Sequence, residues 1–407
     1  MPKKITILSL NYAPEDTAIG LYSTQMAEHL HDLGWNVSVI AGFPYYPQWK
    51  IWDSYKKRRK YHQEVINGVK VLRYRQYVPS KLTFSKRVLQ LIDFTLGSFF
   101  NTYKIREADV VLSIIPFTSS AWLGRLLANR LQAKHWVHIQ DFEFDAAKES
   151  GMTNEKRLSK CLFTMLFKLE SNILNSAHVV STISHRMMNK LGKKSTSVRF
   201  YFPNWVDEEF INPSLAKQHE FLKTDGYKVL YSGNIGEKQD WDFFLKVVEK
   251  FKENEKVKFI VVGHGASKNK LKSATGHLRN VLHFEPVPYS ELNDLLCSAD
   301  LHILFQKETI LDTVMPSKIL GMMASGIPSL VTGHLDSETA KVFNNSRGGL
   351  YFDTSSLQEV INSIVDREIK LQELMGENAK KYVTAHFSKI NVLNKFELRL
   401  TSLINEE

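Results

Sequence analysis

The amino-acid sequence predicts an α/β protein made of two doubly wound domains, each a parallel sheet covered by helices. Three observations lead to this prediction. The 407 residues exceed the usual size of one domain. Short runs rich in Val and Ile alternate with amphipathic helical runs. That alternation stops near the middle of the chain and then restarts, so each half is expected to form its own sheet.

The first half contains six runs with the composition of buried strands, and a helical run over residues 21–33 that ends at Gly34. The expected strands cover residues 5–10, 37–41, 69–74, 110–115, 136–139 and 179–183. We expect them to form a first domain over residues 1–203.

A second series of strands begins after a polar stretch, residues 202–226, that is typical of an interdomain linker. Its members cover residues 229–231, 258–262, 281–284, 301–305 and 329–331. The second domain is expected over residues 204–385, and residues 386–407 form a helix that can pack back on the first domain. Ligands of open parallel sheets bind beyond the carboxyl ends of the strands. We therefore expect the site in the loops that follow the strands, in a cleft between the two domains.

The loop after the first expected strand, residues 11–20, ends at Gly20, where a helix is expected to start. Free backbone N–H groups at a helix N-terminus attract anions, and glycine lets an anion approach closely. We expect Gly20 to lie near a phosphate. A plain turn between strand and helix is the alternative.

The strongest local feature is the stretch Tyr-Ser-Gly-Asn-Ile-Gly-Glu-Lys-Gln at residues 231–239, directly after the first strand of the second half. Two glycines three positions apart allow backbone N–H groups to face a diphosphate, and a lysine adds positive charge. The stretch predicts ligand contacts from Gly233, Asn234, Gly236 and Lys238. The alternative is a tight turn without a ligand.

The next strand ends in Gly263, His264 and Gly265, which predicts another close approach of backbone to ligand, or else a simple loop. The third glycine and the acidic partner of the dinucleotide fingerprint are missing, which disfavours a dehydrogenase. The sequence also lacks a phosphate-binding P-loop motif, which disfavours a nucleoside triphosphatase.

Polar residues follow the strand over residues 301–305 and lead into a helix. Acidic side chains there could accept hydrogen bonds from sugar hydroxyls, and the helix N-terminus offers a second anion or sugar contact. The alternative is a helix start without a ligand. The residues concerned are Glu308, Asp312, Pro316, Ser317 and Lys318.

The sequence predicts no metal site. Asp240 and Asp242 are spaced like a metal-binding pair, but they stand where a helix begins, so we expect them to cap that helix. Cys161 and Cys297 have neither metal-site nor disulfide spacing, which favours a reducing compartment. No cofactor is expected.

Four ionisable residues crowd the end of the strand over residues 136–139: His138, Asp141, Glu143 and Asp145. A histidine and three acids at a strand end suggest catalysis on an acceptor. The alternative is that these acidic loop residues pair with the basic segment over residues 50–106.

The net charge of +10 is concentrated in one segment. Residues 50–106 hold 14 Lys or Arg against three acids, beside Trp49, Trp52 and an apolar run over residues 88–100. Basic residues next to aromatic and apolar ones suit an anionic lipid surface. A solvated basic face is the alternative, and nucleic-acid binding is disfavoured because no known motif accompanies the charge. With no signal sequence or membrane span in sight, we expect a cytoplasmic protein at the inner face of a membrane.

Taken together, these motifs resemble those of family 4 glycosyltransferases of the GT-B fold, in particular the branch that includes a colanic acid biosynthesis fucosyltransferase. The likeness covers nearly the whole chain. It is carried by residues 11–20, 138–145, 180–184, 204–205, 231–239, 316–326 and 375–379, with Tyr382.

This resemblance implies two Rossmann-like domains that face each other across a cleft, and retaining transfer of a sugar from a nucleotide-sugar, GDP- or UDP-linked. The second domain would hold the donor without a metal, Gly20 would reach the distal phosphate, and the first domain would bind a polyprenyl-diphosphate-linked acceptor. The expected setting is assembly of capsule, exopolysaccharide or O-antigen.

The sequence departs from the family pattern where two glutamates, eight positions apart, usually contact sugar and ribose. Ile310 and Lys318 stand there instead, and Asn234 and Ile235 occupy the region of the usual diphosphate-binding arginine. Two alternatives stay open: a nucleotide-sugar epimerase of the same fold, and a membrane-bound protein that binds a nucleotide-sugar without catalysis.

Overall fold

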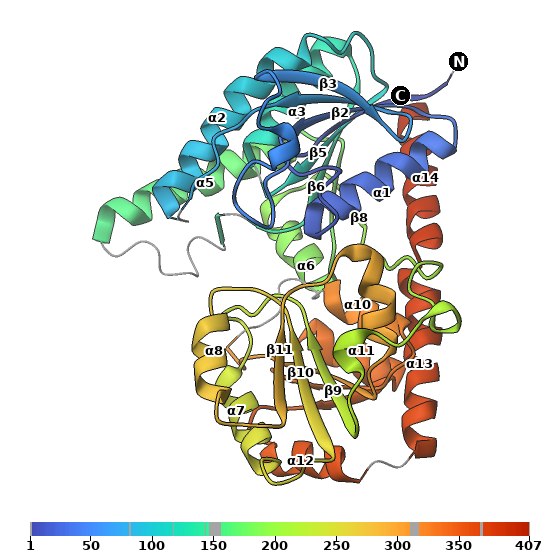
Figure 1. Ribbon diagram of the computed structural model, residues 1–407. Coiled ribbons are helices and arrows are strands. Elements are labelled where there is room, and N and C mark those ends of the chain that lie inside the picture. The colour runs from blue at the N-terminus through green and yellow to red at the C-terminus, as the bar shows by residue number, and fades with distance from the viewer. Residues whose placement is uncertain are drawn as a thin grey trace. The chain divides into compact units, whose positions relative to one another are not determined.

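The computed structural model describes residues 2–80, 83–116, 118–142, 144–145, 156–309, 317–366 and 369–406. It divides into two compact units (Figure 1). Unit 1 comprises Met1–Pro203 and Leu393–Glu407, and unit 2 comprises Asn204–Val392. The predicted fold class is confirmed, because each unit is an α/β unit built on a mainly parallel sheet.

Unit 1 is built on an eight-stranded sheet with strand order β3-β4-β2-β1-β5-β6-β7-β8. All neighbouring strands run parallel except β3 and β4, which are antiparallel. Its elements are β1 Lys4–Leu8, α1 Ala18–Asp32, β2 Asn36–Gly42, β3 Tyr61–Ile66, β4 Val69–Tyr74, α2 Phe84–Thr102, β5 Val110–Ile115, α3 Thr118–Leu131, β6 Lys134–Ile139, α5 Lys156–Asn175, β7 Val179–Thr182, α6 His185–Lys194, β8 Val198–Tyr201 and most of α14 Lys389–Asn405.

The alternation of side chains along β6 places helices on both faces of this sheet. His135 lies beside Ser113 on the face that α3 covers, where Gly124 of α3 approaches both. Trp136 points to the other face, where its ring packs on Phe396 of α14 at 5.0 Å. Successive residues of a strand face opposite sides, so α3 and α14 cover opposite faces of the sheet.

Unit 2 is built on a six-stranded parallel sheet with strand order β11-β10-β9-β12-β13-β14. Its elements are β9 Tyr227–Ser232, α7 Trp241–Lys250, β10 Val257–Val262, α8 Lys268–Thr275, β11 Val281–Phe284, α9 Leu292–Cys297, β12 Leu301–Phe305, α10 Ser317–Ala324, β13 Ser329–Thr332, α11 Glu338–Ser346, β14 Gly349–Phe352, α12 Leu357–Val365 and α13 Ile369–Phe387.

The segment expected to be a linker is largely part of unit 2. Val206, Ile211 and Leu222 are buried in the core of this unit. Short 3-10 helices at Pro213–Leu215 and Glu220–Leu222 give the stretch its compact path. A few apolar residues are enough to fix this segment on the core. The segment is polar overall, so its composition did not indicate this.

Every predicted strand is present, and the described residues contain three strands outside the predictions: β3, β8 and β14. Each is at an edge of its sheet and carries intermediate or exposed residues. The turn that joins β3 to β4 is Asn67-Gly68, with φ values of 46° and 81°, the combination that favours a tight hairpin.

Candidate functional site

The loops that follow β9 and β10 pack backbone against backbone at the carboxyl edge of the unit 2 sheet, meaning the side on which its parallel strands end. A Cβ atom on Gly263 would lie 1.9 Å from the carbonyl oxygen of Gly233. A Cβ atom on Gly265 would lie 2.3 Å from that of Ile235. Glycine is needed at these positions because any side chain would force the two loops apart.

Backbone N–H groups of the β9 loop hold this packing together. Gly233 donates to Val262 O at 2.9 Å, Ile235 donates to His264 O at 2.9 Å, and Gly236 donates to the side chain of Gln239 at 3.1 Å. The sequence predicts that N–H groups of this loop face a diphosphate. In the structure these three N–H groups already have acceptors inside the unit, and the ligand contacts of the loop stay a prediction.

Lys318, on the first turn of α10, reaches the same loop. Its Nζ donates to Tyr231 Oη at 2.8 Å and lies 4.5 Å from the centre of the Tyr231 ring. Tyr231 Oη in turn donates to the carbonyl oxygen of Asn234 at 2.6 Å. The sequence offered no signal for Tyr231, since 87 positions separate it from Lys318.

The remaining donor-site candidates of unit 2 lie on exposed loops. The Lys238 side chain is exposed, and the carbonyl oxygen of Lys238 accepts from Lys307 N. His264 is exposed near Glu285, and Glu308 accepts a hydrogen bond from Thr354 at 2.8 Å. Ser317 is the exposed first residue of α10. Asp312 and Pro316 lie outside the described residues.

Asp240 caps α7, as the sequence predicted. Its carboxylate accepts from Phe243 N at 2.9 Å, and Asp242 lies in the first turn of the helix. The pair stabilises the exposed N–H groups at this helix N-terminus.

His138 lies at the end of β6 in unit 1 and is almost fully buried, with 2% of its surface exposed. Its Nδ1 lies 2.9 Å from Ser181 Oγ on the neighbouring strand β7. Its Nε2 lies 3.0 Å from the amide nitrogen of Gln140. Trp136 Nε1 also donates to Ser181 Oγ at 2.8 Å. Both ring nitrogens of His138 therefore contact protein groups.

These contacts determine the proton arrangement of the ring. Because the Gln140 amide nitrogen is a donor, His138 Nε2 accepts, and the ring proton is on Nδ1 and donated to Ser181. Burial lowers the pKa of His138 to about 3, so the ring is neutral at physiological pH. Here His138 orients Gln140, which neither composition nor local spacing indicated.

The acids of this cluster differ in their surroundings. Asp145 forms ion pairs with Lys190 at 2.8 Å and Lys194 at 2.7 Å, both from α6. Asp141 is partly buried directly after the strand. Glu143 lies outside the described residues. Both partners of Asp145 lie on α6 and not in residues 50–106, so these ion pairs are not the pairing with the basic segment that the alternative predicted.

Gly20 lies in the first turn of α1 and is buried against Glu15. A Cβ atom on Gly20 would lie 2.7 Å from the Glu15 carbonyl oxygen. The Glu15 carboxylate accepts from Tyr45 N and Tyr46 N, each at 2.7 Å, and from Asn11 Nδ2 at 2.9 Å. Glu15 thus joins the loops after β1 and β2 although burial raises its pKa.

A second buried network joins the same loops to β4. Arg73 is fully buried and donates to Gly42 O at 2.8 Å, to Ala13 O and to the Glu64 carboxylate. Gln76 exchanges two hydrogen bonds with the backbone of Phe43, at 2.7 and 2.9 Å. At the carboxyl edge of unit 1, buried polar side chains therefore hold the loops.

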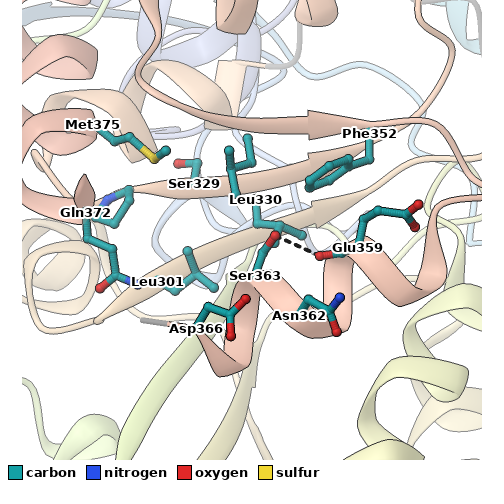
Figure 2. A pocket seen from close by; sticks show the side chains of 12 residues that line it. Leu301, Ser329, Leu330, Phe352, Glu359, Asn362, Ser363, Asp366, Gln372 and Met375 are labelled. Carbon is teal, nitrogen blue, oxygen red and sulfur yellow. Dashed lines mark hydrogen bonds between the residues drawn. The ribbon is translucent and has the colours of Figure 1, made fainter. Parts of the chain in front are cut away.

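A surface pocket of 440 Å³ lies in unit 2 between the sheet and the helices α12 and α13 (Figure 2). It is lined by Leu301 and Ser329, the first residues of their strands, and by Asp366, Gln372 and Met375 of the helical segment. This position is at the amino ends of the strands. It is therefore away from the loops described above.

An apolar stripe runs along the exposed side of α2. Its members are spaced three, four, four and three positions apart and are between 50% and 62% exposed: Leu89, Ile92, Leu96, Phe100 and Tyr103. Tyr61 contacts Phe100 at 6.3 Å, and Lys104 lies over the Tyr61 ring at 5.6 Å. Within the part of the chain that the structure describes, no helix is both long and apolar enough to cross a membrane.

Comparisons with known proteins agree with this architecture. Sucrose-phosphate synthase of Thermosynechococcus elongatus superposes with a TM-score of 0.73 at 13% identity, covering 99% of both chains. HepE of Anabaena, solved in complex with UDP-glucose, superposes with a TM-score of 0.68 at 12% identity, covering 98% of this chain and 99% of its own. The fold is thus that of the GT-B glycosyltransferases.

The sequence comparisons define the family. Residues 17–205 match "Glycosyl transferase 4-like domain" and residues 214–382 match "Glycosyl transferases group 1". The Escherichia coli (strain K12) protein named "Putative colanic acid biosynthesis glycosyl transferase WcaI" is 31% identical over 406 residues, 97% of this chain and 98% of that protein. The chain belongs to the family 4 glycosyltransferases, which confirms the resemblance and the enzyme class predicted from the sequence.

Proposed function

We propose that this glycosyltransferase moves a sugar, with retention, from a nucleoside-diphosphate sugar to a polyprenyl-diphosphate-linked glycan in the assembly of a cell-surface polysaccharide. The observation that carries the proposal is the pair of glycine-joined loops at the carboxyl edge of the unit 2 sheet, the edge where open parallel sheets bind ligands. The complexes of HepE with UDP and UDP-glucose support a nucleotide-sugar donor.

In this proposal the loops of unit 2 surround a UDP- or GDP-linked donor without a metal. Exposed Lys238 is free to reach the phosphates, and exposed acids can accept hydrogen bonds from sugar hydroxyls. The residues proposed to contact the donor are Gly20, Gly233, Asn234, Gly236, Lys238, Gly263, His264, Gly265, Glu308, Asp312, Pro316, Ser317 and Lys318.

We assign acceptor chemistry to the end of β6. Asp141, and Glu143 two residues on, follow the strand directly, and neutral His138 holds the Gln140 amide beside them. Asp145 is proposed to position this loop through its ion pairs with Lys190 and Lys194. A catalytic role for Asp141 needs a carboxylate close to the acceptor hydroxyl.

The apolar stripe of α2 is proposed to lie on an anionic membrane at the cytoplasmic face, where a lipid-linked acceptor would be presented. Apolar side chains that are half or more exposed gain free energy by leaving water. Exposed basic residues near the stripe, Lys60, Lys104 and Arg106, would meet anionic headgroups.

Donor binding is tested by measuring the melting temperature with UDP, GDP, dTDP, CDP or NAD and without added metal. A ligand that binds only the folded state raises that temperature. One nucleoside diphosphate is expected to stabilise wild type, and Lys238→Ala to remove the effect. Stabilisation by NAD alone, or by no nucleotide at millimolar concentration, would contradict the proposal.

Acceptor chemistry is tested with Asp141→Ala and His138→Ala. Each is expected to lower transfer by about 100-fold or more while nucleotide affinity stays within about twofold of wild type, and Lys307→Ala serves as the exposed control. Equal losses of binding and transfer would place these residues outside the acceptor chemistry.

Membrane docking is tested with vesicles of phosphatidylglycerol against vesicles of phosphatidylcholine. Leu96→Glu and Phe100→Glu are each expected to weaken binding to the anionic vesicles by roughly tenfold or more. Leu33→Glu, on a leucine after α1 that is 52% exposed, is expected to leave binding unchanged. If Leu33→Glu weakens binding to the anionic vesicles as much as the α2 variants do, the α2 stripe is not the docking face.

A further inference from the structure

Lys318 is a partly buried cation without an acidic partner in the described part of the chain. Its Nζ contacts the Tyr231 hydroxyl and ring, and no carboxylate among the described residues lies within ion-pair distance of it. Taking an ammonium group out of water is costly unless a negative group compensates. A hydroxyl compensates only in part, so the position favours an anion that the protein itself does not supply.

Tyr231 fixes the direction of this contact. Its hydroxyl donates to the Asn234 carbonyl, so it offers its lone pairs to the Lys318 amine. Burial raises the pKa of Tyr231, which keeps the phenol protonated and the direction of donation constant. The amine is therefore held in place from one side, and its other hydrogens remain to be used.

The amine also faces the bare backbone of Gly233. A Cβ atom at this residue would lie 3.1 Å from Lys318 Nζ. Position 233 has a φ of 133°, which side chains rarely adopt, so the space above the backbone stays open. The N–H groups of Gly233, Ile235 and Gly236 are engaged elsewhere. Lys318 is thus the positive group fixed beside this loop.

We infer that the Lys318 amine binds the pyrophosphate of the nucleotide-sugar donor directly and supplies a fixed positive charge that the engaged amides of Gly233, Ile235 and Gly236 do not. The inference rests on the proposed function, since it assumes a nucleoside-diphosphate donor at this edge of unit 2. A pyrophosphate is the fitting anion because its oxygens can share one ammonium group while Lys238 reaches them from the exposed side.

Binding by this amine carries a proton signature. Burial alone lowers the pKa of Lys318 to about 7. Tyr231 is the titratable group that contacts the amine, and neither Glu237 nor Lys238 of the same loop forms an ion pair with it. A bound pyrophosphate favours the charged amine. The enzyme therefore takes up a proton on binding, and affinity falls as pH rises above about 7.

The test is titration calorimetry of the full-length protein with the nucleoside diphosphate that stabilises it, at pH 6.5, 8.0 and 9.0, in buffers of different ionisation enthalpy. Wild type is expected to lose affinity by up to about tenfold per pH unit above pH 7 and to show buffer-dependent heats. Lys318→Met is expected to bind at least 30-fold more weakly at pH 6.5, a loss set on the order of one charge-assisted contact, with a flat pH profile.

Lys318→Arg keeps a charge that does not titrate, so it is expected to bind without the pH dependence. Lys246→Met, an exposed lysine on α7, is the matched control and is expected to bind like wild type. If Lys318→Met folds, as judged by circular dichroism, and keeps the affinity and pH profile of wild type, the inference is overturned while the proposed function stands. If wild type binds no nucleoside diphosphate, the proposed function fails first.

Discussion

At the carboxyl edge of each sheet, neighbouring loops are held together, but by different groups in the two units. In unit 1, buried polar side chains bridge the loops after β1, β2 and β4: Glu15, Arg73 and Gln76 bind backbone groups of neighbouring loops. In unit 2, the loops after β9 and β10 touch directly through Gly263 and Gly265.

This difference determines which charges remain for ligands. In unit 1 the buried charges of Glu15 and Arg73 are consumed by the protein's own backbone and by Glu64. In unit 2 the close contacts between the two loops are made by backbone atoms, and side chains that bind the β9 loop, such as Tyr231 and Gln239, are uncharged. Lys318 has no acidic partner among the described residues, so its charge remains for a ligand.

The largest effect should come from Arg73→Met, which removes the donor for Gly42 O and Ala13 O and leaves Glu64 without its buried partner. Breaking a buried charged pair on one side costs about 3 to 5 kcal/mol. Urea unfolding measures the loss. Arg73→Lys keeps the charge but lacks the planar guanidinium group, so it should recover only part of the lost free energy of unfolding. A loss below about 1 kcal/mol for Arg73→Met would show that side chains do not hold these loops.

Gly263→Ala should come next, because its methyl carbon would lie 1.9 Å from Gly233 O. Overpacking of this kind costs about 1 to 3 kcal/mol. Gly276→Ala is the control, since a methyl group there meets its first neighbour at 3.4 Å. Equal unfolding free energies for the two variants would show that the close backbone contact at Gly263 does not require glycine.

Acid should weaken the protein through histidines buried in the neutral form. Burial lowers the pKa of His135, His138 and His302 to about 3 from an ordinary 6.5. The unfolded chain then binds more protons between pH 6.5 and 3, so stability falls as pH falls through that window, by up to about 1.4 kcal/mol per pH unit for each histidine.

Two of these three histidines, His135 and His138, belong to unit 1, so acid should destabilise unit 1 more than unit 2. Hydrogen exchange of β6 and β12 peptides, corrected for intrinsic rates, should show β6 losing protection at higher pH than β12. His138→Asn should make the pH dependence of β6 shallower. If β12 opens first, buried histidines do not govern the acid response.

The smallest effect should come from Asp240→Ala, which removes the cap of α7 in unit 2 and costs about 1 kcal/mol. Asp242→Ala, which loses only a charge in the first turn, should cost less. Thermal unfolding measures both. A cost for Asp240→Ala as large as that of Arg73→Met would mean that unit 2 also depends on side-chain hydrogen bonds.

The sequence predicted the central strands well because their residues are buried on both sides. Every residue of β5, Val-Val-Leu-Ser-Ile-Ile, is buried, and such runs are recognisable without knowing their neighbours. Edge strand β3, Tyr-His-Gln-Glu-Val-Ile, buries no residue fully, so its composition resembles that of a loop. Only the Asn67-Gly68 turn could have indicated it.

The candidate site was predictable only as far as it is local. Loops after strands, glycine pairs and the cap at Asp240 follow from short spacing. The contact between Lys318 and Tyr231, and the ion pairs of Asp145 with α6, join residues distant in sequence. Their partners depend on strand order and on side-chain packing, which a single sequence does not reveal.

Helix α14 has a consequence for how the polypeptide is made. Phe396 stacks on Phe202 at 4.4 Å, and Glu397 accepts hydrogen bonds from Lys3 and Trp35, both at 3.2 Å. Phe396 and Glu397 belong to unit 1 but are synthesised only after all of unit 2. During translation, the face of β6 around Trp136 therefore lacks the cover of α14 until all of unit 2 has been added. Apolar surface exposed in this way promotes aggregation of a nascent chain.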